Sequence, residues 1–258
     1  MFAVIATAKT LDFSSLNDAV EASTPYFLNE AEKLVRTARR LSQTHIAESM
    51  KVSAVLAKQT VERFRSFETP FTSDNAKPAI LTFSGEVYRG IDAASLDADD
   101  LAWAQNHLGI ISGLFGLLRP LDLIQPYRLE MAYRLKTRRG SNIYAFWGDL
   151  IVNRINELVT THNEPAIINL ASAEYFRALV PPKITARVVT PVFHEIRPGK
   201  EGRVIPAFAK RARGLMARFI VEERINDPDG LKEFSFDHYR YQRKMSSDDT
   251  LLFSRELI

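Results

Sequence analysis

The sequence predicts an α/β fold in which helices surround a mixed β-sheet. Short apolar runs rich in strand-forming residues occur at 2–6, 79–83 and 166–170 and are typical of buried strands. Longer segments between them carry apolar residues at helical spacing. Within the 258 residues, no change in composition, repeat or low-complexity tract marks a linker. We therefore expect one compact domain spanning 1–258.

The first expected strand, 2–6, is followed by Thr7, Ala8, Lys9 and Thr10. Open α/β sheets commonly bind ligands at the carboxyl ends of their strands. Lys9 is therefore a candidate contact for an anion, with an ordinary loop lysine as the alternative interpretation.

Two exposed helices are expected at 29–41 and 52–67, and Ser42 is expected to cap a further helix between them. Residues 79–83 then predict a second strand, and 84–90 predict a surface loop that brings Tyr88 near the strand ends. We interpret the arginines of the two helices as solvated faces: Arg36, Arg39, Arg40, Arg63 and Arg65.

A helix-hairpin-helix-like element is expected at about 99–125. Apolar residues keep helical spacing up to two glycines, Gly113 and Gly116, which permit tight reversals. A second, short helix is expected between Pro120 and Pro126. Free backbone N–H groups beside a helix N-terminus can bind a phosphate.

Arg119 and Arg128 flank this predicted phosphate site. The alternative is that Gly113 and Gly116 only allow two helices to pack closely, since a G-x-x-G spacing is weak evidence by itself.

In the second half of the chain, 129–139 predicts an extended basic segment and 144–159 a helix that buries Trp147. A strand at 166–170 is followed by two strands, 185–193 and 203–208. The turn at Pro198, Gly199 and Lys200 favours pairing these two as an antiparallel hairpin. A closing edge strand is expected at 250–254.

The segment 207–225 predicts a helix with an apolar stripe and a basic cluster made of Lys210, Arg211, Arg213 and Arg218. No acidic residue precedes Glu222 in this helix. Cations near a helix N-terminus oppose its dipole, so binding of a polyanion would explain their accumulation. A solvated basic face is the alternative.

Composition excludes several classes of function. The chain has no cysteine, which excludes disulfides, thiolate catalysis and cysteine-bound metal sites. Its five histidines form no metal-binding pattern, and no P-loop, dinucleotide fingerprint or nucleophile elbow occurs. No apolar run long enough to cross a membrane is present, so we expect a cytoplasmic protein without cofactor or metal. The net charge is only +3, so anion binding would depend on clustering.

The sequence resembles the YaaA family of bacterial peroxide-stress-resistance proteins. The run SGLFGLLRPLDLIQPYRLEM at 112–131 carries the resemblance, and five blocks agree with it in order along the chain. One departure precedes Lys9, where the family usually has Ser-Pro and this chain has Ala6-Thr7. The blocks are AKTLD at 8–12, FSGEVYRG at 83–90, FWGD at 146–149, INLASAEYF at 168–176 and AKRARGLMARFI at 209–220.

This resemblance implies a cytosolic α/β protein with a basic cleft that binds DNA through a helix-hairpin-helix element. It also implies a role in limiting iron-driven oxidative damage. The leading hypothesis is a monomer that binds duplex or branched DNA without sequence preference and has no catalytic residues. Its expected phosphate contacts are Lys9, Gly113, Gly116, Arg119, Arg128, Lys210, Arg211 and Arg213.

The rival hypothesis is an enzyme that acts on a nucleotide or another phosphorylated small molecule in the same cleft. Tyr88, Tyr127 and Lys210 would then line the cleft with Lys9, and Glu130 beside Arg128 could act as a base. The alternative interpretation of the last two residues is a structural Arg–Glu pair.

Overall fold

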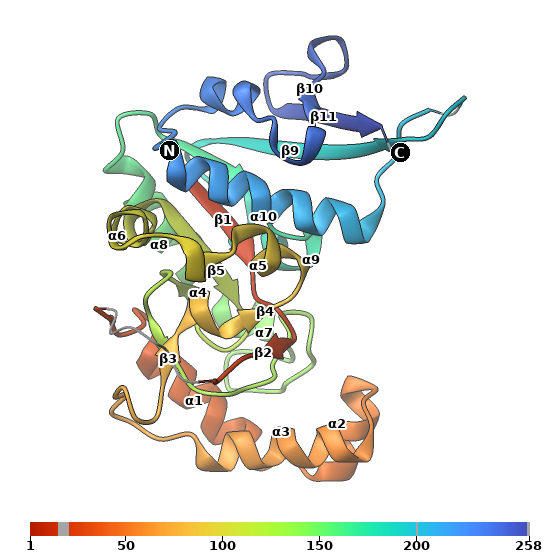
Figure 1. The fold of residues 1–258 in the computed structure, drawn as a ribbon. Helices are drawn as coiled ribbons and strands as arrows, with labels where there is room; N and C mark the ends of the chain where they lie inside the picture. The colour runs from red at the N-terminus through yellow and green to blue at the C-terminus, as the bar shows by residue number, and fades with distance from the viewer. Residues whose placement is uncertain (15–20, 200, 257–258) are drawn as a thin grey trace.

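The computed structural model describes residues 1–14, 21–199 and 201–256. In this part of the chain, seven strands form one sheet, of which five inner strands run parallel and two edges are antiparallel (Figure 1). The expected mixed α/β fold is confirmed. The strand order is β10 (Arg240–Tyr241), β11 (Thr250–Glu256), β9 (Arg187–Ile196), β8 (Ala166–Asn169), β1 (Phe2–Ala6), β5 (Leu108–Ser112) and β6 (Gly116–Leu118).

Strand β1 lies near the centre of the sheet, between β8 and β5. Val4 is opposite Gly109 on one side and Asn169 on the other. The first four residues of β1 are buried, because both faces of an inner parallel strand are covered. This explains why its sequence, FAVIA, is an unbroken apolar run.

Four short strands form two further antiparallel pairs. β2 (Thr10–Leu11) pairs with β4 (Phe83–Ser84), and β3 (Lys77–Pro78) pairs with β7 (Leu123–Ile124). The first pair holds the segment that leaves β1 against the segment that enters α5.

Helix α10 (Pro206–Glu222) packs on the sheet and also contacts helix α5 (Glu86–Ile91), which it crosses (Figure 1). The crossing is close because Gly90 and Gly214 meet there; a Cβ at Gly214 would overlap the carbonyl of Val87. The other helices around the sheet are α4 (Ala79–Thr82), α6 (Ala98–His107), α7 (Ile143–Trp147), α8 (Leu150–Thr160) and α9 (Ala173–Phe176).

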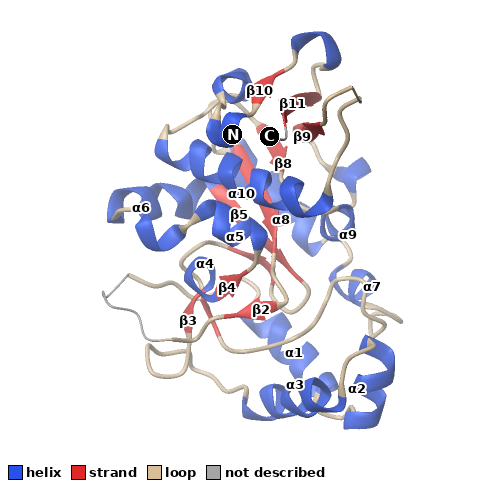
Figure 2. Ribbon diagram, turned by 45° about the vertical axis from the view of Figure 1, so that its right-hand side comes forward, coloured by secondary structure: helices blue, strands red, loops and turns tan. Residues whose placement is uncertain are grey.

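Three helices occupy the opposite end of the molecule from β10 and β11: α1 (Leu28–Ala38), α2 (Gln43–Met50) and α3 (Ala54–Ser66) (Figures 1 and 2). α2 and α3 share a small apolar core made by Ile46, Ala57 and Val61. We call residues 42–66 the α2–α3 unit.

The structure does not contain the helix-hairpin-helix-like element expected at 99–125. Helix α6 ends at His107, and the next five residues form β5 instead of continuing the helix. β5 pairs with β1 and turns through Gly113 into β6, and the segment between Pro120 and Pro126 contains the short strand β7 rather than a helix. Helical spacing misled here because β5 is buried at every position, so its apolar residues also fit the spacing of a helix.

Five other expectations were wrong in part. Residues 79–83 form mainly α4, and 84–90 enter helix α5 rather than a loop. The helix expected at 144–159 is divided at Gly148, whose φ is +48°. Segment 203–208 does not form the second strand of the expected hairpin; it makes one antiparallel bridge, from Arg203 to Glu195, before α10 begins. The partners of β9 in the sheet are β8 and β11, and both run parallel to it. Lys200 of the predicted turn lies outside the described residues. The strand expected to close the edge, β11, lies one place inside it, next to β10.

Candidate functional site

The carboxyl ends of β1 and β5 form a polar edge of the sheet, as expected for an open α/β protein. The hydroxyl of Ser112 lies 2.7 Å from that of Tyr127, and Tyr88 donates to the carbonyl of Ala6 at 3.1 Å. Thr7 continues β1 by donating its N–H to Ile111 at 3.2 Å. A proline at this position has no N–H and could not make this bond.

Three buried tyrosines surround Thr7 at this edge. Burial raises the pKa of Tyr88 and of Tyr127, and it raises the pKa of Tyr175 to about 12, with hydrogen bonding to Thr7 acting in the opposite direction. All three phenols are therefore neutral near pH 7 and offer O–H groups rather than phenolate charges.

Glu130 joins two of the predicted anion contacts. Its Oε1 atom lies 3.1 Å from Nζ of Lys9 and 3.1 Å from a terminal nitrogen of Arg128. Lys9 is largely exposed, whereas the side chain of Arg128 is only 12% exposed. The structural Arg–Glu pair that the sequence suggested is thus present, and it includes Lys9.

Arg63 approaches this cluster from α3. Burial, followed by the positive charge of Arg128, lowers the pKa of Arg63. Sequence analysis interpreted Arg63, with the other arginines of the two helices, as part of a solvated helix face. Only the packing of α3 against the 125–128 segment, which is non-local, brings it to Arg128. We call Lys9, Arg63, Arg128 and Glu130 the strand-edge cluster.

Gly113 and Gly116 lie buried in the β5–β6 hairpin, away from any surface that a phosphate could reach. Gly113 abuts the carbonyl of Leu129, and a Cβ at Gly116 would lie 2.8 Å from the ring of Trp147. Trp147 itself is buried as expected and donates to the carbonyl of Gly113 at 3.0 Å. The close-packing interpretation of the two glycines therefore fits the structure, with strands in place of helices.

The side chain of Arg119 forms its hydrogen bonds with neighbouring loop residues. Its guanidinium donates to the buried carboxylate of Asp122 at 2.9 Å and to the carbonyl of Thr24 at 3.3 Å. Burial raises the pKa of Asp122, while Ser23 and Arg119 oppose that shift by hydrogen bonding. We assign Arg119 to holding this loop.

The basic residues of α10 divide into two groups. Lys210 and Arg211 are exposed, and neither makes an ion pair or side-chain hydrogen bond to another described residue. Arg213 is partly buried, and burial lowers its pKa. No hydrogen bond or ion pair in the described part of the chain connects these three to the strand-edge cluster.

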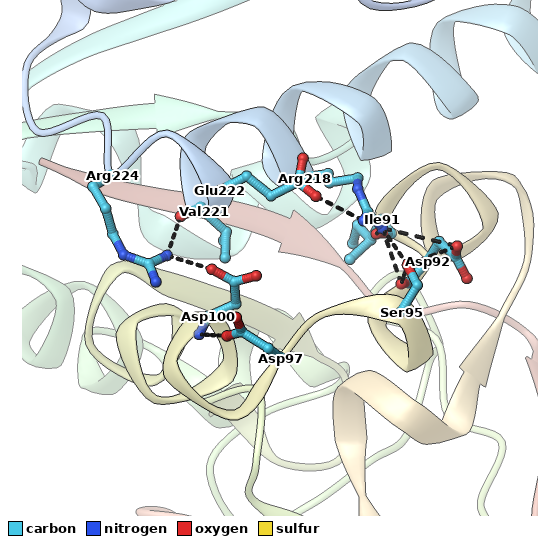
Figure 3. Close-up of polar contacts among 9 residues, drawn as sticks. All are labelled: Ile91, Asp92, Ser95, Asp97, Asp100, Arg218, Val221, Glu222 and Arg224. Atoms are coloured by element: carbon cyan, nitrogen blue, oxygen red, sulfur yellow. Dashed lines mark hydrogen bonds and ion pairs between the residues drawn. The ribbon is translucent and has the colours of Figure 1, made fainter.

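Arg218 is a structural residue (Figure 3). It donates to the carbonyl of Ile91 at 2.9 Å and to the hydroxyl of Ser95 at 2.7 Å, and it pairs with Glu222 at 2.7 Å. These bonds tie α10 to the end of α5. Just beyond the end of α10, Arg224 pairs with Asp100 of α6 at 2.7 Å.

Sequence analysis expected both helices of the α2–α3 unit, one of them capped by Ser42, but did not consider the unit as a binding site. Ser42 and Ser53 cap the two helices, because each side chain accepts a hydrogen bond from the backbone N–H three residues further on. Lys51 ends α2 in the left-handed region, with a φ of +52°. The two serine caps were a readable signal of two separate short helices. Ser49 contacts the hydroxyl of Tyr133 at 2.7 Å and so attaches the unit to the 129–135 segment.

A cavity of about 800 Å³ lies at the opposite edge of the sheet, beside the first residues of β9 and β11. Its charges are largely paired, for example Arg187 with Asp249 and Lys232 with Asp229. Within the described ranges, no three potential ligands are grouped closely enough to hold a metal ion. Nor does that part of the chain contain a helix of the length and apolarity needed to cross a bilayer.

Comparison with known proteins places this chain among named relatives. A family model described as "Peroxide stress protein YaaA" matches residues 1–245. The chain is 46% identical to a UPF0246 protein of Aromatoleum aromaticum over 259 residues, covering 99% of both chains. It is 45% identical to a UPF0246 protein of Burkholderia lata over 259 residues, covering 100% of this chain and 99% of that one. For a UPF0246 protein of Aliivibrio fischeri the identity is 43% over 256 residues, with coverage of 99% and 98%. The chain belongs to the YaaA family of peroxide stress proteins.

Proposed function

We propose that this peroxide stress protein binds duplex DNA with little sequence preference and thereby shields it from iron-driven oxidation in the cytoplasm. The observation that carries the proposal is the α2–α3 unit, two helices joined by a tight turn at an exposed end of the molecule. Such units present a helix N-terminus and flanking cations to a phosphate backbone.

The N-terminus of α3 supplies suitable donors. Ser53 bonds the N–H of Leu56 at 3.3 Å, and the N–H groups of Ala54 and Val55, both exposed residues, have no partner among the described residues. The positive end of the helix dipole adds to their attraction for an anion. These donors replace the ones that the sequence placed at Gly113 and Gly116.

Exposed cations surround these donors. Arg40, Lys51 and Arg65 lie on the three-helix end and make no side-chain ion pair with another described residue. The strand-edge cluster adjoins the α2–α3 unit through Arg63, so Lys9 and Arg128 would extend the interface toward the sheet. Lys210 and Arg211 would form a separate contact on α10.

The proposal is tested by the salt dependence of binding to short fluorescent duplexes. If four to six phosphates are neutralised, log K should fall with log salt at a slope of roughly −4 to −5, since each contact contributes about −0.9. Two unrelated duplexes of equal length should bind alike. A flat salt response, or strong discrimination between the duplexes, would reject the proposal.

A further inference from the structure

Arg128 has an unsatisfied donor. One terminal nitrogen bonds Glu130 at 3.1 Å, but the buried Nε atom has no hydrogen-bond partner. Buried polar groups are almost always bonded, and a guanidinium left incompletely bonded is costly. An unsatisfied buried donor of this kind requires an explanation, and a bound anion would provide one.

Arg63 adds a second positive charge close to Arg128, since burial and then the charge of Arg128 lower the pKa of Arg63. The residue is partly buried, and its guanidinium makes no hydrogen bond or ion pair with any described residue. Gln125 bonds both the N–H and the carbonyl of Glu68, at 3.0 and 2.9 Å, just beyond the end of α3. These bonds hold the end of the helix that carries Arg63 next to the segment that carries Arg128.

The charge of the strand-edge cluster is unbalanced. Three cations, Lys9, Arg63 and Arg128, share one carboxylate, Glu130, which leaves a formal charge of +2. Glu174, the next carboxylate along this edge, accepts from the N–H of Ala132 instead. A paired arrangement of arginines suits the several oxygens of a phosphate group.

We propose that the strand-edge cluster binds a phosphomonoester dianion, such as that of a nucleoside 5′-monophosphate or a 5′-phosphorylated DNA end. A monoester carries close to two negative charges at neutral pH and matches the excess charge, whereas an internal DNA phosphodiester carries one. Lys9, 65% exposed, and Glu130, 30% exposed, leave the cluster open to solvent on one side. The site shares Lys9 and Arg128 with the proposed DNA interface but requires no duplex, so the two proposals fail separately.

The experiment is calorimetric titration of the intact protein at pH 8 with adenosine 5′-monophosphate and with adenosine 3′,5′-cyclic monophosphate. The two nucleotides share base and sugar, but the cyclic one is a singly charged diester. We expect the monoester to bind at least 10-fold more tightly, and inorganic phosphate to compete with it. Equal binding of both nucleotides, or binding of neither, would overturn the proposal.

Variants then assign the binding to the cluster. Arg63→Gln and Arg128→Gln should each weaken monoester binding on the order of 10- to 100-fold, the loss of one charge-assisted contact. Lys58→Gln, which removes an exposed cation of the same helix that pairs with Glu62, is the matched control and should change nothing. Glu130→Gln should strengthen binding, because it removes the only competing carboxylate from the cluster. Loss of structure alone would weaken monoester binding in every variant, so it would not explain weaker binding in Arg63→Gln together with stronger binding in Glu130→Gln. Unchanged monoester binding in both variants would reject the assignment.

Duplexes with a 5′-phosphate or a 5′-hydroxyl end distinguish the two sources of the monoester. A preference for the phosphorylated end that disappears in Arg63→Gln identifies a DNA end as the ligand. Monoester binding without that preference identifies a free nucleotide. A preference for the phosphorylated end that survives in both Arg63→Gln and Arg128→Gln would place end recognition elsewhere and contradict the proposal.

Discussion

At the scale of single residues, two positions of the β5–β6 hairpin require glycine because neighbouring atoms leave no room for a Cβ. Gly113 faces the carbonyl of Leu129, and Gly116 combines a φ of +70° with contact to the ring of Trp147. We predict that Gly113→Ala and Gly116→Ala each lower the free energy of unfolding by about 1–3 kcal/mol through overpacking and backbone strain. Urea denaturation measures this.

The control for these variants is Gly148→Ala, where φ is +48° but no atom lies within 4 Å of the new Cβ. It should suffer only the backbone cost and lose less stability than Gly116→Ala. DNA affinity of the folded variants should stay at the parent level. Weakened DNA binding by a fully stable Gly116→Ala protein would instead restore the hairpin as a phosphate site.

His162 makes the fold sensitive to acid. Burial, then the N-terminal ammonium and His107, lower the pKa of His162 to about 4, and burial also lowers the pKa of His107, whose ring centroid lies 4.9 Å away. An unfolded histidine titrates near 6.5, so between pH 6.5 and 4 the unfolded chain binds more protons. Stability should therefore fall as the pH decreases through this window.

We predict that His162→Asn flattens the decline of the urea midpoint between pH 6.5 and 4. The exposed His45→Asn variant serves as the control and should follow the parent profile. If the His162→Asn midpoint falls as steeply as that of the parent, acid sensitivity arises elsewhere.

At the scale of elements, Lys51 connects stability with binding in the α2–α3 unit. It ends α2 at φ +52°, a conformation that costs a residue with a Cβ about 1 kcal/mol and glycine much less. We predict that Lys51→Gly raises the free energy of unfolding by about 0.5–1 kcal/mol. If Lys51 contacts a phosphate, the same change weakens DNA binding and makes the salt slope shallower by about 1.

Lys58→Gln is the comparison variant, because Lys58 is exposed in the middle of α3 and pairs only loosely with Glu62, at 3.9 Å. It should leave stability within about 0.5 kcal/mol of the parent. A Lys51→Gly protein that is less stable than the parent would contradict the strained cap.

The elements that sequence analysis predicted well have local signals. Strand β1 is a short apolar run, and α1 and α10 have clear apolar stripes. The helix predicted over 108–111 was wrong, because an apolar segment after a helix fits both a longer helix and a buried strand. Only pairing with β1 determines that this segment is a strand. Arg63 was missed for a similar reason, since its proximity to Arg128 depends on packing between segments 65 residues apart in sequence.

At the scale of the whole molecule, α10 separates basic residues that stabilise the fold from basic residues that are free to bind. Arg218 is 18% exposed, connects α10 to Ile91 and Ser95, and pairs with Glu222 of the same helix. We predict that Arg218→Met lowers the free energy of unfolding by about 1–3 kcal/mol, because the carbonyl of the buried Ile91 and the hydroxyl of Ser95 lose a charged donor.

Replacing both Lys210 and Arg211 with Ala should change stability by less than about 0.5 kcal/mol. If DNA reaches α10, the double variant should lose affinity and show a salt slope shallower by about 2. Both proteins are compared by urea denaturation and by titration with one duplex. Loss of stability in step with loss of binding would identify Lys210 and Arg211 as structural.

The central position of β1 has a consequence for synthesis of the protein. Its two neighbours in the sheet, β5 and β8, begin at Leu108 and Ala166, so the ribosome makes β1 long before either exists. At about 5–20 residues per second, the nascent chain would carry FAVIA unpaired for roughly 5–20 s before β5 is made. During that interval the segment is an apolar strand without partners, a natural target for a ribosome-associated chaperone. Protection of the nascent chain from protease should therefore appear late and abruptly, after Asn169 has emerged.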